Sequence, residues 1–283
     1  MDIESLLAHL PIERFRNPPP LVTVLRLHGI IGERPSLPGR AGLSLAHMAE
    51  AIEAAFAPSR LAAVALSINS PGGSPVQSSL LCRRIRQKAR EKNVPVLAFV
   101  EDVGASGGYM LACAGDEIHV DESSIVGSIG VVTSTFGLHR LIERFGVERR
   151  LYTAGERKAM LDPFRPENPD DVARLRHLQD EIHASFRALV RERREGKLAE
   201  PEEDLFEGDI WTGRRAVELG LADGIGDLRE VCRKRFGEKV RLRLMRAERP
   251  GLLRRMLGAT RSPAPDDWLA AIEDRALWSR FGL

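Results

Sequence analysis

Short apolar segments alternate with segments of helical periodicity along most of the chain. The apolar, partly β-branched segments predict strands at 21–31, 61–69, 94–101, 117–121 and 147–154. Helical periodicity predicts helices at 44–57, 76–92, 109–115, 136–146 and 170–194. Ser44 suits the N-cap of the first of these helices. Strands that alternate with helices are typical of parallel βαβ units, so an α/β fold is expected.

The segment 170–194 predicts the longest helix. Its apolar residues recur every three or four positions and form one stripe: Val172, Leu175, Leu178, Ile182, Phe186, Leu189 and Val190. Acidic residues stand at the start of the segment and arginines at its end, as the helix dipole favours.

The pattern also divides the chain into regions. We expect an N-terminal extension at 1–20, a main domain at 21–245, and a basic, proline-broken appendage of unassigned role at 246–283. The first residues lack the basic start and the long apolar run of a secretion signal. No segment approaches the ~20 apolar residues of a membrane span. These features predict a cytoplasmic protein, soluble or peripheral to the inner membrane.

Composition narrows the possible functions. With a formal net charge of +2, the chain has no general preference for nucleic acid. Its three cysteines include no CxxC pair, which excludes a disulfide framework and a zinc ribbon and suits a reducing compartment.

Two glycine-bearing turns each follow a predicted strand and precede a predicted helix. In the first, Gly72 and Gly73 could let main-chain N–H groups meet a developing oxyanion, or could simply make a tight turn. In the second, Ser106 lies among glycines at a strand-to-helix junction. It could act as a nucleophile, or it could only cap the helix that follows.

A nucleophilic serine needs a base, and the histidines are poorly placed to provide one. The downstream histidines lie within predicted strands or helices, not on a loop after a late strand: His119, His139, His177 and His183.

A neutral lysine is the alternative base, and burial favours its neutral form. Most lysines lie on charged helices or in basic segments: Lys88, Lys92, Lys197, Lys234 and Lys239. Lys158 differs, because it follows the predicted strand 147–154 directly. We therefore predict that Lys158 is the base, with an exposed loop lysine as the alternative.

At these residues the chain resembles the signal peptide peptidase A family of Ser–Lys proteases. The resemblance rests on five segments in order: SINSPGG (67–73), DVGASGGYMLACAGDEI (102–118), GSIGV (127–131), LYTAGERKAMLDPF (151–164) and GDIWTGRRAVELGLADGIGD (208–227). The resemblance as a whole covers about residues 20–240.

The resemblance implies a site and an assembly. Ser106 would be the nucleophile, Lys158 the general base, and Ser128 a hydrogen-bond partner of that lysine. Main-chain N–H groups of Gly72 or Gly73 and of Gly107 would form the oxyanion hole. The family fold is similar to that of ClpP and the crotonases, a spiral of repeated ββα units. Peptide substrates, no cofactor and no metal, and a homo-oligomer with active sites shared between subunits are implied as well.

The chain departs from the family pattern at two points. Ala159 stands where members often have an acidic residue, and no N-terminal membrane anchor is visible. The second departure weakens the expectation that signal-peptide remnants are the substrate. Two other functions stay open at this point: a crotonase-like acyl-CoA enzyme, and an inactive peptide-binding scaffold of the same fold.

Overall fold

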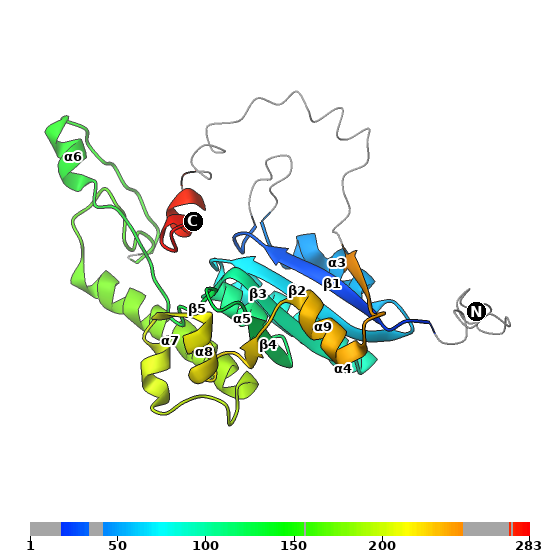
Figure 1. Ribbon diagram of the computed structural model, residues 1–283. Coiled ribbons are helices and arrows are strands. Elements are labelled where there is room, and N and C mark those ends of the chain that lie inside the picture. The colour runs from blue at the N-terminus through cyan, green and yellow to red at the C-terminus, as the bar shows by residue number, and fades with distance from the viewer. Residues whose placement is uncertain (1–17, 34–41, 156, 246–271, 273) are drawn as a thin grey trace, which may run out of the picture. The chain divides into compact units, whose positions relative to one another are not determined.

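The computed structural model describes residues 18–33, 42–155, 157–245, 272 and 274–283. The chain forms two compact units (Figure 1). Unit 1 contains the residues up to Ile129 and those from Leu189 onward, and unit 2 is Gly130–Ala188. Most of the predicted extension 1–20 and of the predicted appendage 246–283 lies outside the described residues.

Unit 1 is built on an eight-stranded sheet with the order β6-β5-β3-β2-β1-β8, in which β4 pairs with β3 and with β7. The strands are β1 (Leu21–His28), β2 (Leu61–Ser70), β3 (Val96–Ala105), β4 (Glu117–Val120), β5 (Ile125–Gly127), β6 (Ile210–Thr212), β7 (Gly224–Ile225) and β8 (Arg241–Met245). All pairs are parallel except β5 with β6. Four of the five predicted strands are confirmed, and the sheet is mostly parallel, as expected for βαβ units.

Helices cover both faces of this sheet (Figure 1). They are α3 (Leu45–Phe56), α4 (Pro75–Lys92), α5 (Gly107–Ala112), α8 (Gly213–Glu218), α9 (Leu228–Phe236) and a 3-10 helix (Glu202–Phe206). On the α3 side, the buried Thr23 hydroxyl donates to Ala55 O at 2.8 Å. On the other face, α9 brings buried Cys232 against β1, β2 and β3. Ser44 caps α3 as predicted, accepting from the His47 N–H.

Strand β3 pairs with two different strands along one edge, and this arrangement positions the site. Its first half, from Leu97, lies beside β4, whereas Val103–Ala105 lies beside β5. Because β2 pairs with the other edge of β3, the ends of β2, β3 and β5 converge at one place. The glycine turn after β2 and the serine turn after β3 both begin there.

Unit 2 contains α6 (His139–Arg144) and the first part of α7 (Pro169–Arg193), which ends in unit 1. The strand predicted at 147–154 is wrong, because this segment pairs with no strand. A strand needs a neighbour for its main-chain groups. The charged side chains of this segment instead bind locally, Arg149 to Asp162 and Arg150 to Glu148.

Few side chains of unit 2 are buried. Within its described residues, Phe186 alone is buried. On the apolar stripe of α7, Phe186 and Val190 are covered, whereas Leu178 and Ile182 are exposed. None of the helices in the described ranges has the length and apolar character that crossing a membrane requires.

Candidate active site

Ser106 has a strained main chain at the junction of β3 and α5. Its φ of 52° and ψ of −121° lie where residues other than glycine are rare, at a cost of about 1–3 kcal/mol. Ser106 N–H donates to Gly127 O at 2.8 Å, which holds the turn against β5. The side chain makes no capping hydrogen bond. The capping alternative is therefore wrong, and the half-buried hydroxyl is left for another use.

The glycine turn after β2 lies directly against this serine. A Cβ on Gly72 would come within 2.8 Å of the Ser106 Cβ and 2.9 Å of Gly107 N. A Cβ on Gly73 would lie 2.1 Å from Ile31 O. Both glycines also have positive φ, 100° and 140°. The predicted oxyanion glycines and the predicted nucleophile are thus brought together, and no larger residue fits in the turn.

The main-chain N–H groups of the two turns are not equally free. Gly72 N–H donates to the Ser70 hydroxyl at 3.2 Å. Gly107 is the first residue of α5, so its N–H has no acceptor within the helix. Ile31 binds Gly72 O and Ser74 N–H, the groups on either side of Gly73. Gly73 and Gly107 are therefore better placed than Gly72 to bind an oxyanion.

Two helix N-termini meet at these turns. Helix α4 begins one residue after Ser74, which caps it by accepting from Gln77 N–H. Helix α5 begins directly after Ser106. Since the N-terminal end of a helix is positive, both helices favour negative charge near the Ser106 hydroxyl.

Ser128 follows β5 and has a positive φ of 53°. Its N–H donates to Asp209 O at 2.6 Å, and the preceding Gly127 supplies the carbonyl that binds Ser106 N–H. The carbonyl that holds the nucleophile turn and the Ser128 N–H therefore belong to the same peptide group, so Ser128 directly adjoins this main-chain contact. The roles of Gly127 O and Asp209 O could not be found from the sequence, because main-chain contacts leave no side-chain signal.

Lys158 belongs to unit 2, whereas Ser106 belongs to unit 1. It lies in a turn in which its N–H donates to Gly155 O at 3.2 Å, and its side chain is exposed on this chain. The prediction that a strand precedes Lys158 is wrong, because the charged segment before this lysine pairs with no strand. The sequence argument that singled out Lys158 as the base rested on that strand and fails with it.

Two of the four candidate histidines, His119 and His177, have contacts away from Ser106. His119 stacks on Phe99 with ring centroids 5.3 Å apart, and its Nε2 lies 3.3 Å from Glu117. His177 pairs with Glu181 along α7. In the part of the chain that the structure describes, no group of three or more His, Cys, Asp or Glu side chains could hold a metal ion.

A protein-family model, individual proteins and solved structures are similar to this chain. The model of peptidase family S49 matches residues 88–240. A protein of Synechocystis sp. named as a protease is 31% identical over 69% of this chain and 72% of its own length. The chloroplastic serine protease SPPA of Arabidopsis thaliana is 35% identical over 59% of this chain and 24% of its own length.

One relative of higher identity is named as a transporter and not as a protease. The Na(+)/H(+) antiporter NhaA of Brucella abortus is 51% identical over 99% of this chain, which spans only 39% of that protein. Among solved structures, the membrane-bound stomatin-specific protease 1510-N, bound to a substrate peptide, aligns with a TM-score of 0.50 at 15% identity, over 86% of this chain and 98% of its own. The predicted α/β fold of the ClpP and crotonase type is confirmed.

The sequence matches to proteases and the family model relate this chain to the class of serine-type peptidases. Within that class, the family model covers more than half of the chain. The chain belongs to peptidase family S49.

Proposed function

We propose that this chain cleaves peptide bonds with Ser106 as nucleophile and Lys158 as general base. The observation that carries the proposal is the strained Ser106 turn, packed against Gly72 with its hydroxyl free of a capping bond. Such strain is a feature of nucleophile turns. Family membership supplies the class of reaction.

The steps use groups described above. Neutral Lys158 removes the Ser106 proton as Oγ attacks the scissile carbonyl, and the N–H groups of Gly73 and Gly107 bind the oxyanion. Protonated Lys158 then protonates the leaving amine. Water, activated by the same lysine, hydrolyses the acyl-enzyme. Ser128 binds the lysine and holds it in place. No cofactor takes part.

The substrates are proposed to be extended apolar peptides like those of signal peptide peptidases. Among the relatives, an Enterococcus faecium protein is named after such a peptidase. An extended peptide binds a sheet edge through main-chain hydrogen bonds, and neighbouring pockets select its side chains.

A second copy of the chain is proposed to cover unit 2. Lysine acts as a base only when neutral, and burial favours that form, yet the Lys158 side chain is exposed on one chain. Large apolar side chains of unit 2 are exposed too, including Phe136 at 80% and Tyr152 at 89%. Packing these side chains against a neighbouring chain would remove them from water, and with them the loop that carries Lys158. Active sites shared between subunits follow from this arrangement.

Contact with a membrane surface is a further part of the proposal. The Brucella abortus relative is named as an antiporter, and the 1510-N protease is described as membrane-bound. Sedimentation of the purified chain with bacterial membranes, compared with sedimentation without them, tests this part.

The central test combines activity with a serine-reactive fluorophosphonate. Wild type should cleave apolar peptides and be labelled at Ser106, whereas Ser106→Ala and Lys158→Met should do neither. Ser123→Ala, at an exposed serine outside the site, and Lys92→Ala, at an exposed lysine on α4, are the matched controls and should keep full activity. Equal cleavage by all variants would refute the dyad. Turnover of an acyl-CoA without peptide cleavage would favour the crotonase alternative.

The assembly has its own measurement. Light scattering after size exclusion should give a mass several times the 31.4 kDa of one chain. Phe136→Glu should lower both this mass and the peptidase activity. A wild type that is active as a single chain would contradict shared sites.

A further inference from the structure

The helix that follows the nucleophile is too short to hold its own position. Helix α5 has six residues, all of them buried. Isolated helices shorter than about 12–15 residues are marginal in water, so the placement of α5 depends on its tertiary contacts. Because Ser106 immediately precedes α5, any shift of this helix moves the Ser106 hydroxyl.

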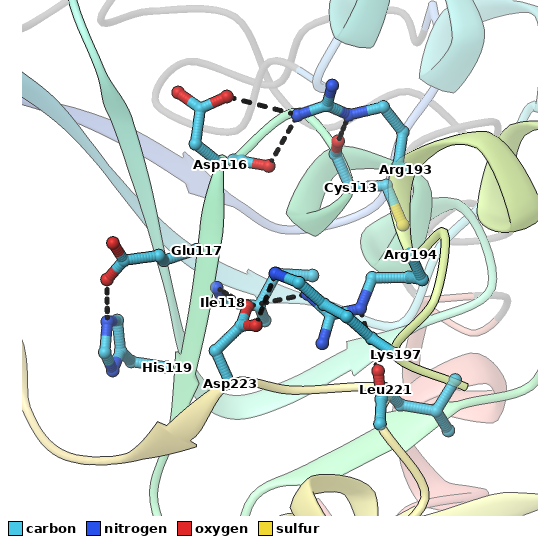
Figure 2. A network of polar contacts seen from close by, with 12 residues as sticks. Cys113, Asp116, Glu117, Ile118, His119, Arg193, Arg194, Lys197, Leu221 and Asp223 are labelled. Atoms are coloured by element: carbon cyan, nitrogen blue, oxygen red, sulfur yellow. Dashed lines mark hydrogen bonds and ion pairs between the residues drawn. The ribbon is translucent and has the colours of Figure 1, made fainter. Parts of the chain in front are cut away.

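The carboxyl end of α5, meaning the turn 113–115 that directly follows the helix, is held by two arginines from other helices. Figure 2 shows one of them, Arg193, beside Cys113. Arg193, the last residue of α7, donates from Nε to Cys113 O and from Nη2 to Gly115 O, both at 2.9 Å. Arg86 of α4 donates to Ala114 O at 3.1 Å. Three successive carbonyls that have no acceptor role within α5 are thus bound by positive groups, which the negative helix end favours.

The same arginines connect this helix end to the start of β3. Asp116 Oδ1 lies 2.7 Å from Arg86 and 3.3 Å from Arg193. Its other oxygen accepts from the Val96 N–H at 2.9 Å. Strand β3 begins at Val96 and ends at Ala105, next to Ser106. The two elements that flank the nucleophile are therefore joined at their far ends by one ionic cluster.

The other side of α5 has a separate attachment. The hydroxyl of fully buried Tyr109 donates to Leu221 O at 2.8 Å. Arg194, adjacent to Arg193, binds Gly220 O and the Asp223 carboxylate, on either side of Leu221 (Figure 2). Arg194 is only 2% exposed, so its removal threatens folding, whereas the Arg193 side chain is 20% exposed.

We propose that Arg193 is a positioning residue for Ser106, acting through the carboxyl end of α5. The inference rests on the proposed function. The planar guanidinium reaches two carbonyls that are two residues apart, and a lysine ammonium cannot reproduce this fork. Loss of Arg193 frees the end of α5 and misplaces Oγ relative to the Gly73 and Gly107 N–H groups.

The test compares Arg193→Gln and Arg193→Lys with wild type. Arg191→Gln is the matched control, because Arg191 is on the same helix but pairs with Glu202 at 2.9 Å and contacts no carbonyl of the α5 end. For each variant we would measure kcat and KM on an apolar peptide, the rate of fluorophosphonate labelling of Ser106, and hydrogen exchange over 107–116.

A misplacement of about 1 Å costs on the order of a hundredfold in rate. Arg193→Gln should therefore lower kcat and the labelling rate about ten- to a hundredfold with KM within about twofold, and should speed exchange over 107–116. Arg193→Lys should recover part of the rate, and Arg191→Gln should match wild type.

Two failures are distinguishable. If wild type itself is neither active nor labelled, the proposed function fails. If wild type is labelled and Arg193→Gln is labelled at the same rate, or exchange over 107–116 is unchanged, the positioning role is wrong. A rate loss shared by Arg191→Gln, in step with a lower melting temperature, would also overturn it.

Discussion

The most informative stability prediction concerns Asp223, which lies at the centre of a polar network in unit 1 (Figure 2). Its carboxylate accepts from Arg194 at 2.6 Å, from Lys197 at 2.7 Å and from the Ile118 N–H at 2.7 Å. The substitution Asp223→Asn keeps the shape of the side chain but removes the charge. It leaves the Arg194 guanidinium, which is 2% exposed, without its counter-charge.

The expected magnitude follows from this burial. Removing one partner of a buried ion pair costs about 3–5 kcal/mol, because the remaining charge is buried and unpaired. With a urea m-value of roughly 2–3 kcal/mol/M, the unfolding midpoint should fall by about 1–2 M. Glu218→Gln is the control. Its partner Arg215 lies at 2.7 Å, but both side chains are more than half exposed, so the loss should be below ~0.5 kcal/mol.

The effect also has a predicted pH dependence. Burial alone would raise the pKa of Asp223, but the bonds from Arg194, Lys197 and the Ile118 N–H outweigh it and lower the pKa below the ordinary value of 3.8. A lowered folded-state pKa contributes stability that is present above the unfolded value and is lost as pH falls through the folded value. The difference in unfolding free energy between wild type and Asp223→Asn should therefore be constant from about pH 5 to 8 and shrink below about pH 4.

Urea unfolding followed by far-UV circular dichroism at pH 7 and at pH 3 provides both measurements. A difference in unfolding free energy below ~1 kcal/mol at pH 7 would show that the Arg194 charge is stabilised by other groups when Asp223 is replaced. That result would refute the reasoning. A difference of full size that persists at pH 3 would refute the assigned pKa direction.

Three other predictions can be checked with the same protein. Gly72→Ala should abolish peptidase activity and cost about 2–4 kcal/mol by urea unfolding, because its Cβ would lie 2.8 Å from that of Ser106 at a φ of 100°; wild-type activity would contradict the packing of this turn. Burial raises the pKa of Cys82 to about 11 and of Cys113 to about 12, so Ellman's reagent should react with these thiols only after unfolding, and fast reaction of native protein would count against their burial. Burial lowers the pKa of His28 below 6.5, so its contribution to stability should decline as pH falls from about 6.5; His28→Gln should remove this part of the pH dependence, and an identical profile would contradict it.

Local patterns in the sequence predicted the elements of unit 1 from β1 through β4, but not β5 to β8, α8 or α9. Strand β2 and helix α3 were predicted because an apolar run and an amphipathic period each express a local preference, and Ser44 caps α3 as its residue type suggests. The prediction of a strand at 147–154 was wrong, because a strand also needs a neighbouring strand to pair with. The charged side chains of this segment form local ion pairs instead.

For the site residues too, local sequence indicated the chemistry, whereas their contacts depend on tertiary structure. Residue type and spacing pointed to Ser106 and to the glycines as chemically suitable, but they left capping and a simple turn as alternatives. The contact of Gly72 with Ser106 depends on the pairing of β2 with β3 and could be decided only by tertiary structure. For Lys158 the sequence argument used a strand that does not form, so its role as the base stays a prediction.

By itself, the sequence determined the α/β class, the five ordered segments that carry the family resemblance, and the chemical types at the proposed site. Tertiary structure alone decided that Ser106 is strained and free of a capping bond, and that Arg193 holds the carboxyl end of α5. The physical reason is that propensity and periodicity are properties of neighbouring residues. Hydrogen bonds to main-chain carbonyls 80 residues away, such as that from Arg193 to Cys113, leave no pattern in either segment.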